Sequence, residues 1–343
     1  MKAITITSVF LSGNLENFCN DNNIPILKRA KKIENSIVPK YIHLLKLIVD
    51  FFFIIKHIRT IRKFDTIISV GYLSFIILIL KKVGVLKNVR IVWVGFFLHN
   101  KKYFNYFKFI FKILLDPRVS ILVYSRYEIQ LYSSLIGIPS NQIEYLPLIF
   151  DSNFFENDEF ENKVILDLIP KEYYFSGGYS DRDYLTLINV FRNIKEKLVI
   201  CCSYLNHEID NIETTSNIII LRDLTRNDFN SLLKKSKACI LLIKSNLGAA
   251  GQLFALEAMY NSKLLLSSST HILNEIVEDE KTGLVIENPY RDLPNKIKRI
   301  EGCDFEQSKL ILNAKNKVLK NHSRYEFDTT LTNILNHSIK QFN

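Results

Sequence analysis

The chain has 343 residues, 48% of them hydrophobic, which is enough for two domains with substantial cores. Its five cysteines have no metal-ligand spacing, so a zinc or iron motif is excluded and buried thiols in a reducing cytoplasm are favoured. The formal net charge of +10 indicates an anionic partner. Zinc-finger, helix-turn-helix and RNA-binding aromatic signatures are absent from the sequence, which disfavours nucleic acid.

The positive charge is concentrated in the first half of the chain. Residues 1–150 carry 21 Lys and Arg against 8 Asp and Glu, a net charge of +13, whereas the remaining residues carry 24 against 27. This asymmetry favours contact with an anionic surface such as a membrane. The longest uncharged apolar run, residues 66–80, is too short to span a bilayer, and we expect no signal peptide before the first strand.

In the first half, apolar and β-branched runs alternate with helical patterns, which predicts a parallel sheet wrapped by helices. The predicted strands are residues 3–9, 66–70, 90–95, 121–124 and 144–146. The predicted helices are residues 41–62, 74–83, 103–115 and 127–136.

Two of these helical stretches combine apolar and basic residues. Residues 41–63 are very apolar yet carry five Lys and Arg, and residues 101–113 interleave four lysines with six aromatic residues. This mixture suits a helix lying in the headgroup layer of a membrane, with rings such as Phe104, Phe107 and Phe111 in the interface. The alternative is a core helix with snorkelling lysines, in which these rings are buried.

The second half repeats the alternation after an acidic stretch, residues 156–161, that reads as a linker. The predicted strands are residues 173–176, 198–202, 218–221, 238–243, 263–266 and 284–286. The predicted helices are residues 185–195, 227–235 and 252–261, a short one carrying Glu275, and a final one over 325–342.

A turn of small residues, 245–251, joins the strand 238–243 to the helix 252–261. Small residues let the backbone approach a ligand, and the free N–H groups and dipole at a helix start suit a diphosphate. Glu257, the one acid of this segment, can accept hydrogen bonds from neighbouring hydroxyls, as on a ribose. We therefore predict a nucleotide-sugar site that includes Ala250, Gly251, Gln252 and Glu257.

This stretch resembles the C-terminal domain of GT-B glycosyltransferases of the large retaining family 4. The family pattern is Glu, seven residues, Glu-Ala-Met, then Glu-Ile-Val and Thr-Gly-Leu-Val; residues 257–259, 275–277 and 282–285 match it in order and spacing. Residues 124–155 are similar to the family's segment that closes the first domain. One departure is Ala249, which stands where the family has its first Glu, an acid that touches the donor sugar.

The resemblance implies a GT-B fold, in which two Rossmann-like domains face each other across a donor/acceptor cleft. Residues 1–160 would form the acceptor domain, with a helix over about 325–343 packing back on it. Residues 171–322 would bind the nucleotide sugar.

The resemblance also implies roles for residues in two further loops. Gly177 and Gly178 would line the donor site, and Arg182 would bind the diphosphate and neutralise the leaving group. His99 would lie near the donor sugar as a second catalytic residue. No metal and no cofactor are expected.

We therefore expect a glycosyltransferase that moves a sugar from a nucleotide diphosphate sugar to a lipid-linked or growing cell-surface polysaccharide, such as a capsule or O-antigen. It would be cytoplasmic and peripheral on the inner face of the membrane. The family mechanism is retaining, but Ala249 leaves open an inverting mechanism with His99 or a nearby acid as base. The alternatives are a GT-B sugar-nucleotide epimerase and a catalytically degenerate GT-B protein that binds a membrane surface.

Overall fold

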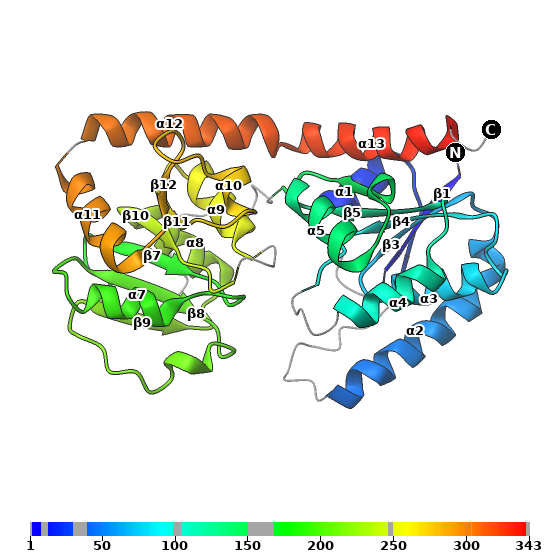
Figure 1. Ribbon diagram of the computed structural model, residues 1–343, viewed down its shortest axis with the longest axis horizontal. Helices are drawn as coiled ribbons and strands as arrows, with labels where there is room; N and C mark the ends of the chain where they lie inside the picture. The colour runs from blue at the N-terminus through cyan, green and yellow to red at the C-terminus, as the bar shows by residue number, and fades with distance from the viewer. Residues whose placement is uncertain are drawn as a thin grey trace. The chain divides into compact units, whose positions relative to one another are not determined.

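The computed structural model describes seven segments of the chain, residues 2–7, 13–29, 40–98, 104–149, 168–245, 250–302 and 304–340. The chain divides into two compact units, an N-terminal unit of Met1–Leu146 with Asp328–Asn343, and a C-terminal unit of Pro147–Phe327. Each unit is built on its own six-stranded sheet with flanking helices (Figure 1). The predicted α/β class is therefore confirmed.

The sheet of the N-terminal unit has the order β2-β1-β3-β4-β5-β6, and all neighbouring strands are parallel. Its strands are β1 (Ala3–Thr7), β2 (Ile26–Lys28), β3 (Thr66–Val70), β4 (Arg90–Val94), β5 (Val119–Val123) and β6 (Ile143–Tyr145). Its helices are α1 (Gly13–Asp21), α2 (Lys40–Ile61), α3 (Leu73–Lys82), α4 (Phe104–Leu114), α5 (Arg126–Ile136) and α13 (Arg324–Lys340). Strands β1, β4 and β5 are buried along their whole length, which explains their continuous apolar runs.

Aromatic rings join α3, β4 and α4. Phe75 of α3 packs edge-on against Trp93 of β4 with ring centroids 4.7 Å apart, and Phe111 of α4 lies 5.9 Å from Phe75. Phe104 is 7% exposed and Phe111 1%, and Phe107 stacks on Phe75. Phe104 and Phe111 therefore belong to the core, and Phe107 packs partly buried against Phe75. The interpretation that these rings enter a membrane interface is thus wrong for Phe104 and Phe111. The exposed apolar side chains of α4 are instead Tyr106, Phe109 and Ile113.

Helix α13 packs on the N-terminal unit through a buried arginine, although it ends the chain. Arg90, the first residue of β4, donates hydrogen bonds to the carbonyls of Leu335 at 2.9 Å and Ile334 at 2.8 Å. Burial lowers the pKa of Arg90 to about 10, so it stays charged at neutral pH. A buried guanidinium needs acceptors, and these carbonyls hold α13 against the start of β4.

The sheet of the C-terminal unit has the order β12-β11-β10-β7-β8-β9 and is also parallel throughout. Its strands are β7 (Tyr174–Gly177), β8 (Leu198–Cys202), β9 (Ile218–Arg222), β10 (Ala238–Leu241), β11 (Leu264–Ser268) and β12 (Leu284–Ile286). Its helices are α7 (Tyr184–Phe191), α8 (Arg226–Lys235), α9 (Gln252–Tyr260), α10 (Leu273–Ile276), α11 (Pro289–Glu301) and α12 (Asp304–Asn321).

Each face of this second sheet has its own hydrophobic core. On one face, alternate strand residues such as Tyr174 and Ile200 pack with Leu187 of α7 and Leu293 of α11. On the other face, Phe175 and its neighbours pack with residues of α8, α9 and α12. This alternation along each strand buries both faces, as in doubly wound α/β folds.

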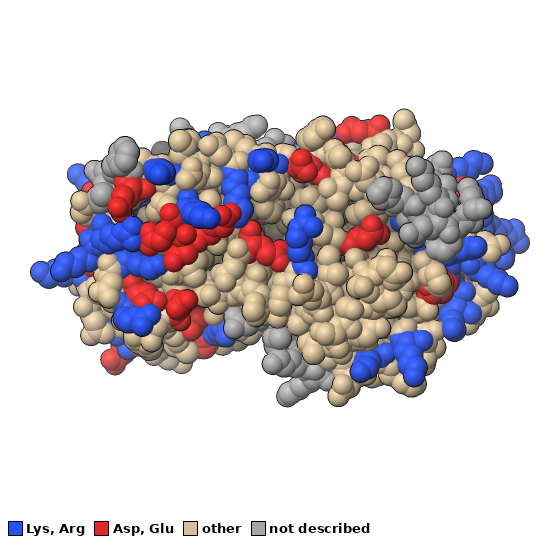
Figure 2. Space-filling model, turned by 45° about the horizontal axis from the view of Figure 1, so that its top comes forward, with Lys and Arg blue, Asp and Glu red and all other residues tan. Residues whose placement is uncertain are grey.

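Charge and exposed apolar surface differ between the two units. Acidic and basic side chains are interleaved over the C-terminal unit, whereas basic ones gather at one end of the N-terminal unit (Figure 2). In α2, residues 47–49, 51, 52 and 55 are exposed and apolar, and Lys56 and Arg59 follow them on the surface. Within the segments that the structure describes, no helix combines the length and apolarity needed to cross a bilayer.

A Phe→Ala substitution should have a large effect on stability on the buried face of α4 and a small effect on its exposed face. Phe111→Ala should lower the free energy of unfolding of the N-terminal unit by roughly 3–5 kcal/mol, because it removes a ring from a packed core. Phe109→Ala on the same helix should change it by less than about 0.5 kcal/mol, because Phe109 is 66% exposed. Urea denaturation followed by tryptophan fluorescence of Trp93 measures both. Equal losses in the two variants would contradict this orientation of α4.

Candidate functional site

The candidate site lies where the strand order of the C-terminal sheet reverses. The chain passes from β7 through β8 to β9 in one direction, then returns to place β10 on the other side of β7. In open α/β sheets, ligands bind outside the carboxyl ends of the strands at such a switch point. The two predicted loops, the one after Gly177 and the one before Gln252, follow β7 and β10 and therefore start at this point.

Gly177 and Gly178 are required by close packing. A Cβ atom at Gly177 would overlap with the ring of Phe229 from α8. Gly178 has φ +112°, which L side chains rarely adopt, and a Cβ atom there would lie 2.5 Å from Nη2 of Arg182. The glycines thus let the loop curl around the Arg182 guanidinium.

Arg182 is buried inside this loop, with 6% of its surface exposed. Its Nε donates to the carbonyl of Gly177 at 3.0 Å, and its Nη1 donates to the carbonyl of Ser180 at 2.6 Å. Burial lowers its pKa, and the negative charges of Asp181 and Glu257 oppose that effect. The predicted phosphate-binding arginine is therefore a fixed positive charge at the carboxyl end of β7.

Asp181 ties the two loops together. It adopts a positive φ of 58°, and its Oδ2 accepts hydrogen bonds from the backbone N–H of Ser245 at 3.1 Å and from its hydroxyl at 2.9 Å. The carbonyl of Asp181 also accepts from the N–H of Lys244 at 3.0 Å. Because these bonds span both loops, the backbone after β10 is held in place by the loop that carries Arg182.

Helix α9 begins at this junction. Its N-cap residue is Gly251, with φ +86° and no side-chain cap, and a Cβ atom there would lie 2.9 Å from Cδ2 of Leu241. Ala250 is 5% exposed and Gln252 4%. Because glycine has no side chain, Gly251 cannot cap the first N–H groups of α9. Such a helix start favours an anion.

Glu257 of α9 forms a partly buried ion pair. Its Oε1 accepts a hydrogen bond from Nη2 of Arg226, the first residue of α8. The Glu257 side chain is 7% exposed and that of Arg226 40%, so the arginine covers the carboxylate on the solvent side. Burial raises the pKa of Glu257, while Arg226 and then Arg182 act against that rise.

The structure brings together Gly177, Gly178, Arg182, Gln252 and Glu257 of the predicted set, with Ala250 and Gly251 in the connecting loop. His99 and Ala249 lie outside the described residues, so their predicted roles stay predictions.

Sequence reasoning missed Arg226. It lies 31 positions from Glu257 in the chain. One signal could have found it, because it is the first helical residue after β9 and so also lies at the carboxyl edge of the sheet.

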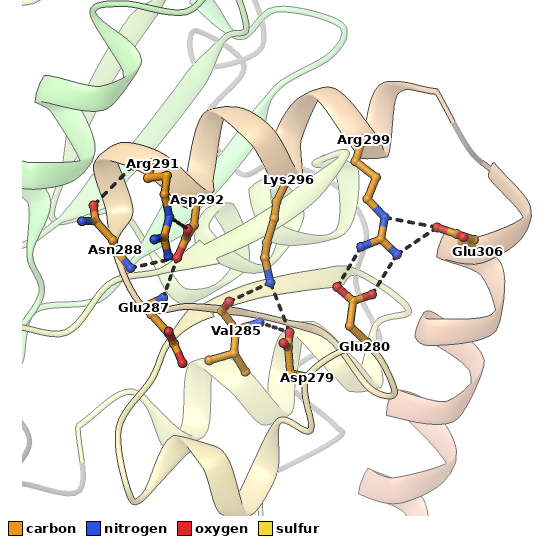
Figure 3. A network of polar contacts seen from close by, with 10 residues as sticks. All are labelled: Asp279, Glu280, Val285, Glu287, Asn288, Arg291, Asp292, Lys296, Arg299 and Glu306. Atoms are coloured by element: carbon orange, nitrogen blue, oxygen red, sulfur yellow. Dashed lines mark hydrogen bonds and ion pairs between the residues drawn. The ribbon is translucent and has the colours of Figure 1, made fainter.

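A second polar cluster surrounds α11 (Figure 3), and part of it lines a hollow. Most of its charged side chains are paired with one another. Arg299 forms two parallel bonds of 2.8 Å with Glu280 and also contacts Glu306. Lys296 contacts Asp279 at 3.2 Å. Lys296 also donates to the carbonyl of Val285 in β12 at 2.8 Å, so these contacts fasten α11 to β12, to the turn before it and to α12. We therefore interpret this cluster as structural.

A model of a known family matches most of the C-terminal unit. Residues 170–317 match the model of the family described as glycosyl transferases group 1. No curated protein sequence matches the chain significantly. The matched range contains the whole candidate site, and together with the fold this match supports a transferase.

Solved structures resemble the chain over nearly its whole length. HepE of Anabaena, in complex with UDP, has a TM-score of 0.71 at 11% identity and covers 98% of this chain and 100% of its own. Sucrose-phosphate synthase of Thermosynechococcus elongatus has a TM-score of 0.74 at 13% identity and covers 99% and 100%. A glycosyltransferase of Rickettsia africae has a TM-score of 0.68 at 14% identity and covers 98% of each chain. The predicted GT-B fold is confirmed by this likeness.

Gly178→Ala should destabilise the backbone and should also disturb the position of Arg182. Gly84 also has a positive φ, +89°, but no atom lies within 4 Å of a Cβ atom there. Both substitutions should destabilise their units by about 1–2 kcal/mol through backbone strain. Only Gly178→Ala should also displace Arg182 and reduce the rise in melting temperature that a bound nucleotide causes. An unchanged rise in that variant would show that the curl around Arg182 is not needed.

Proposed function

We propose that this protein is a glycosyltransferase that binds a nucleoside diphosphate sugar at the carboxyl edge of the C-terminal sheet. The observation that carries the proposal is the buried carboxylate of Glu257 in α9, which pairs with Arg226 and is also influenced by the charge of Arg182. A diphosphate fits the helix start and the arginines. A ribose, the adjacent part of the same ligand, presents the two hydroxyls that a carboxylate can accept.

The donor that we propose carries a uridine diphosphate. The support comes from HepE, whose solved structures include complexes with UDP and with UDP-glucose. The sugar itself is a separate matter, because Ala249 stands where the family pattern has the acid for the donor sugar. We therefore expect the base and diphosphate to be retained and the sugar to differ.

In the proposed reaction, the oxygen of an acceptor hydroxyl forms a bond to the anomeric carbon while the bond between that carbon and the diphosphate breaks. Negative charge grows on the diphosphate, which takes up the proton of the hydroxyl. Arg182 is a fixed positive charge near that group, and the dipole of α9 adds to it. We propose that these groups do the work that a divalent ion does elsewhere, so the reaction needs no metal. The mechanism would be retaining, with an inverting reaction through His99 as the alternative.

A nucleotide screen tests the donor class. A ligand that binds only the native state raises the apparent melting temperature. UDP and UDP-sugars should raise it, and no shift with any of the UDP, GDP, ADP or TDP series would contradict the proposed function. Product analysis with the donor and a lipid-linked acceptor then distinguishes a glycosyltransferase from the two alternatives. An epimerase changes only the sugar of the donor, and a catalytically degenerate binding protein forms no product.

Glu257→Gln should weaken nucleotide binding without unfolding the C-terminal unit. The amide keeps the shape of the carboxylate but loses its charge, and a hydrogen bond to a charged group contributes about 1.5–3 kcal/mol. Calorimetry should therefore show a loss of affinity of roughly one to two orders of magnitude. Glu280→Gln, which removes the carboxylate that pairs with Arg299 of α11, is the matched control and should bind as the wild type does. Equal affinity in both variants would remove Glu257 from the site.

We also propose that the N-terminal unit holds the enzyme on the anionic inner face of the cytoplasmic membrane, where a lipid-linked acceptor would be available. The support is the exposed apolar surface of α2 and α4, next to exposed Lys56, Arg59, Lys108 and Lys112. Each basic residue near an anionic surface contributes on the order of 1 kcal/mol. Exposed rings such as Phe109, which is 66% exposed, add an interaction that salt does not screen.

Liposome sedimentation should therefore show two components. Reversing the charge of Lys108 and Lys112 should remove part of the salt-sensitive binding to phosphatidylserine vesicles. Tyr106→Ser with Phe109→Ser should reduce the binding that survives high salt. Leu312→Ser on α12, at a side chain that is 59% exposed, is the control and should change neither component. Protein that ignores anionic vesicles at low salt would rule out the membrane assignment.

A further inference from the structure

Arg226 is the direct ion-pair partner of Glu257 in the candidate site. It is the first residue of α8, and its guanidinium meets the Glu257 carboxylate from the solvent side. Resting on the function proposed above, we propose that Arg226 is a positioning residue for the donor, which keeps Glu257 ionised and oriented so that it can accept the ribose hydroxyls.

Arg226 packs against an aromatic ring of its own helix. Its guanidinium carbon lies 5.4 Å from the ring centroid of Phe229, three residues further along α8. That ring packs edge-on against Phe175 of β7 at 5.3 Å and also fills the space beside Gly177. One aromatic cluster thus links Arg226 to the glycine loop, and a pre-organised partner costs little entropy on binding.

Glu257 depends on Arg226 for its charge. Besides Arg226 from α8, the titratable groups facing Glu257 are Arg182 from the loop after β7 and the thiol of Cys239 from β10. Burial raises the pKa of Cys239 to about 12, so this thiol is neutral at pH 7 and adds no charge beside the carboxylate. Arg182 already donates to two backbone carbonyls. Arg226 is therefore the direct counter-charge of the carboxylate.

The direction of the pH effect follows from these contacts. Burial alone favours the neutral acid, and Arg226 is the largest influence that acts against it. A carboxylate accepts hydrogen bonds at both oxygens, whereas the neutral acid is a weaker acceptor. Nucleotide affinity should therefore fall as the pH falls through the pKa of Glu257. Without Arg226 that pKa is higher, so the fall should begin at a higher pH.

The experiment is calorimetry of the full chain with UDP, GDP and ADP between pH 6 and 9. The nucleotide that binds most tightly is then titrated into the variants over the same pH range. Arg226→Gln should weaken binding on the order of tenfold at pH 7, move the pH profile upward and regain much of its affinity by pH 9. Arg226→Lys keeps a positive charge and should lose less. In a Glu257→Gln background, Arg226→Gln should have no further effect, because the group that it positions is gone.

Arg299→Gln is the matched control, because it also removes an arginine from an ion pair of the C-terminal unit, at α11 (Figure 3). It should leave affinity and pH profile unchanged. A loss in Arg226→Gln that persists at every pH and in the Glu257→Gln background would overturn the proposal, since Arg226 would then touch the nucleotide itself. Wild-type affinity in Arg226→Gln would overturn it while leaving the proposed function intact. No binding of any nucleotide to the wild type would overturn both.

Discussion

A carboxylate buried in a protein interior needs a positive partner, and the candidate site depends on how the fold provides one. The Glu257 side chain of α9 is buried and contacts Arg226 of α8. Arg182, in the loop after β7, adds a second positive charge. Taking a charge out of water costs several kcal/mol unless it is paired. The sheet reduces this cost by bringing three segments that are distant in the chain to one edge.

The same edge is held rigidly by small residues and local bonds. Gly177 admits the ring of Phe229, and Asp181 fastens the loop after β7 to the loop after β10. Such a site loses little conformational freedom when a ligand binds. The fold thus places positive charges and backbone N–H groups together at this edge. Such preorganised groups are what stabilises the negative charge of a diphosphate leaving group.

Much of the fold could be predicted from the sequence, because buried parallel strands are short apolar runs and helices repeat with a period of 3.6. The orientation of α4 could not, since residues 104, 107 and 111, which pack toward the core, and the exposed residues 106, 109 and 113 have the same spacing and are almost all aromatic. The Arg226–Glu257 pair was also missed, because an ion pair across 31 residues leaves no local pattern. Glu257 itself was found because it is the one acid in an uncharged helix.

The central claim is that the carboxyl edge of the C-terminal sheet, between β7 and β10, binds a nucleoside diphosphate. A crystal structure of the protein soaked with UDP tests it most directly. Our account predicts the diphosphate at the start of α9, the ribose hydroxyls on the Glu257 carboxylate and Arg226 still paired with that carboxylate. UDP bound elsewhere, for example in the hollow beside α11, or a ribose that does not touch Glu257, would contradict it.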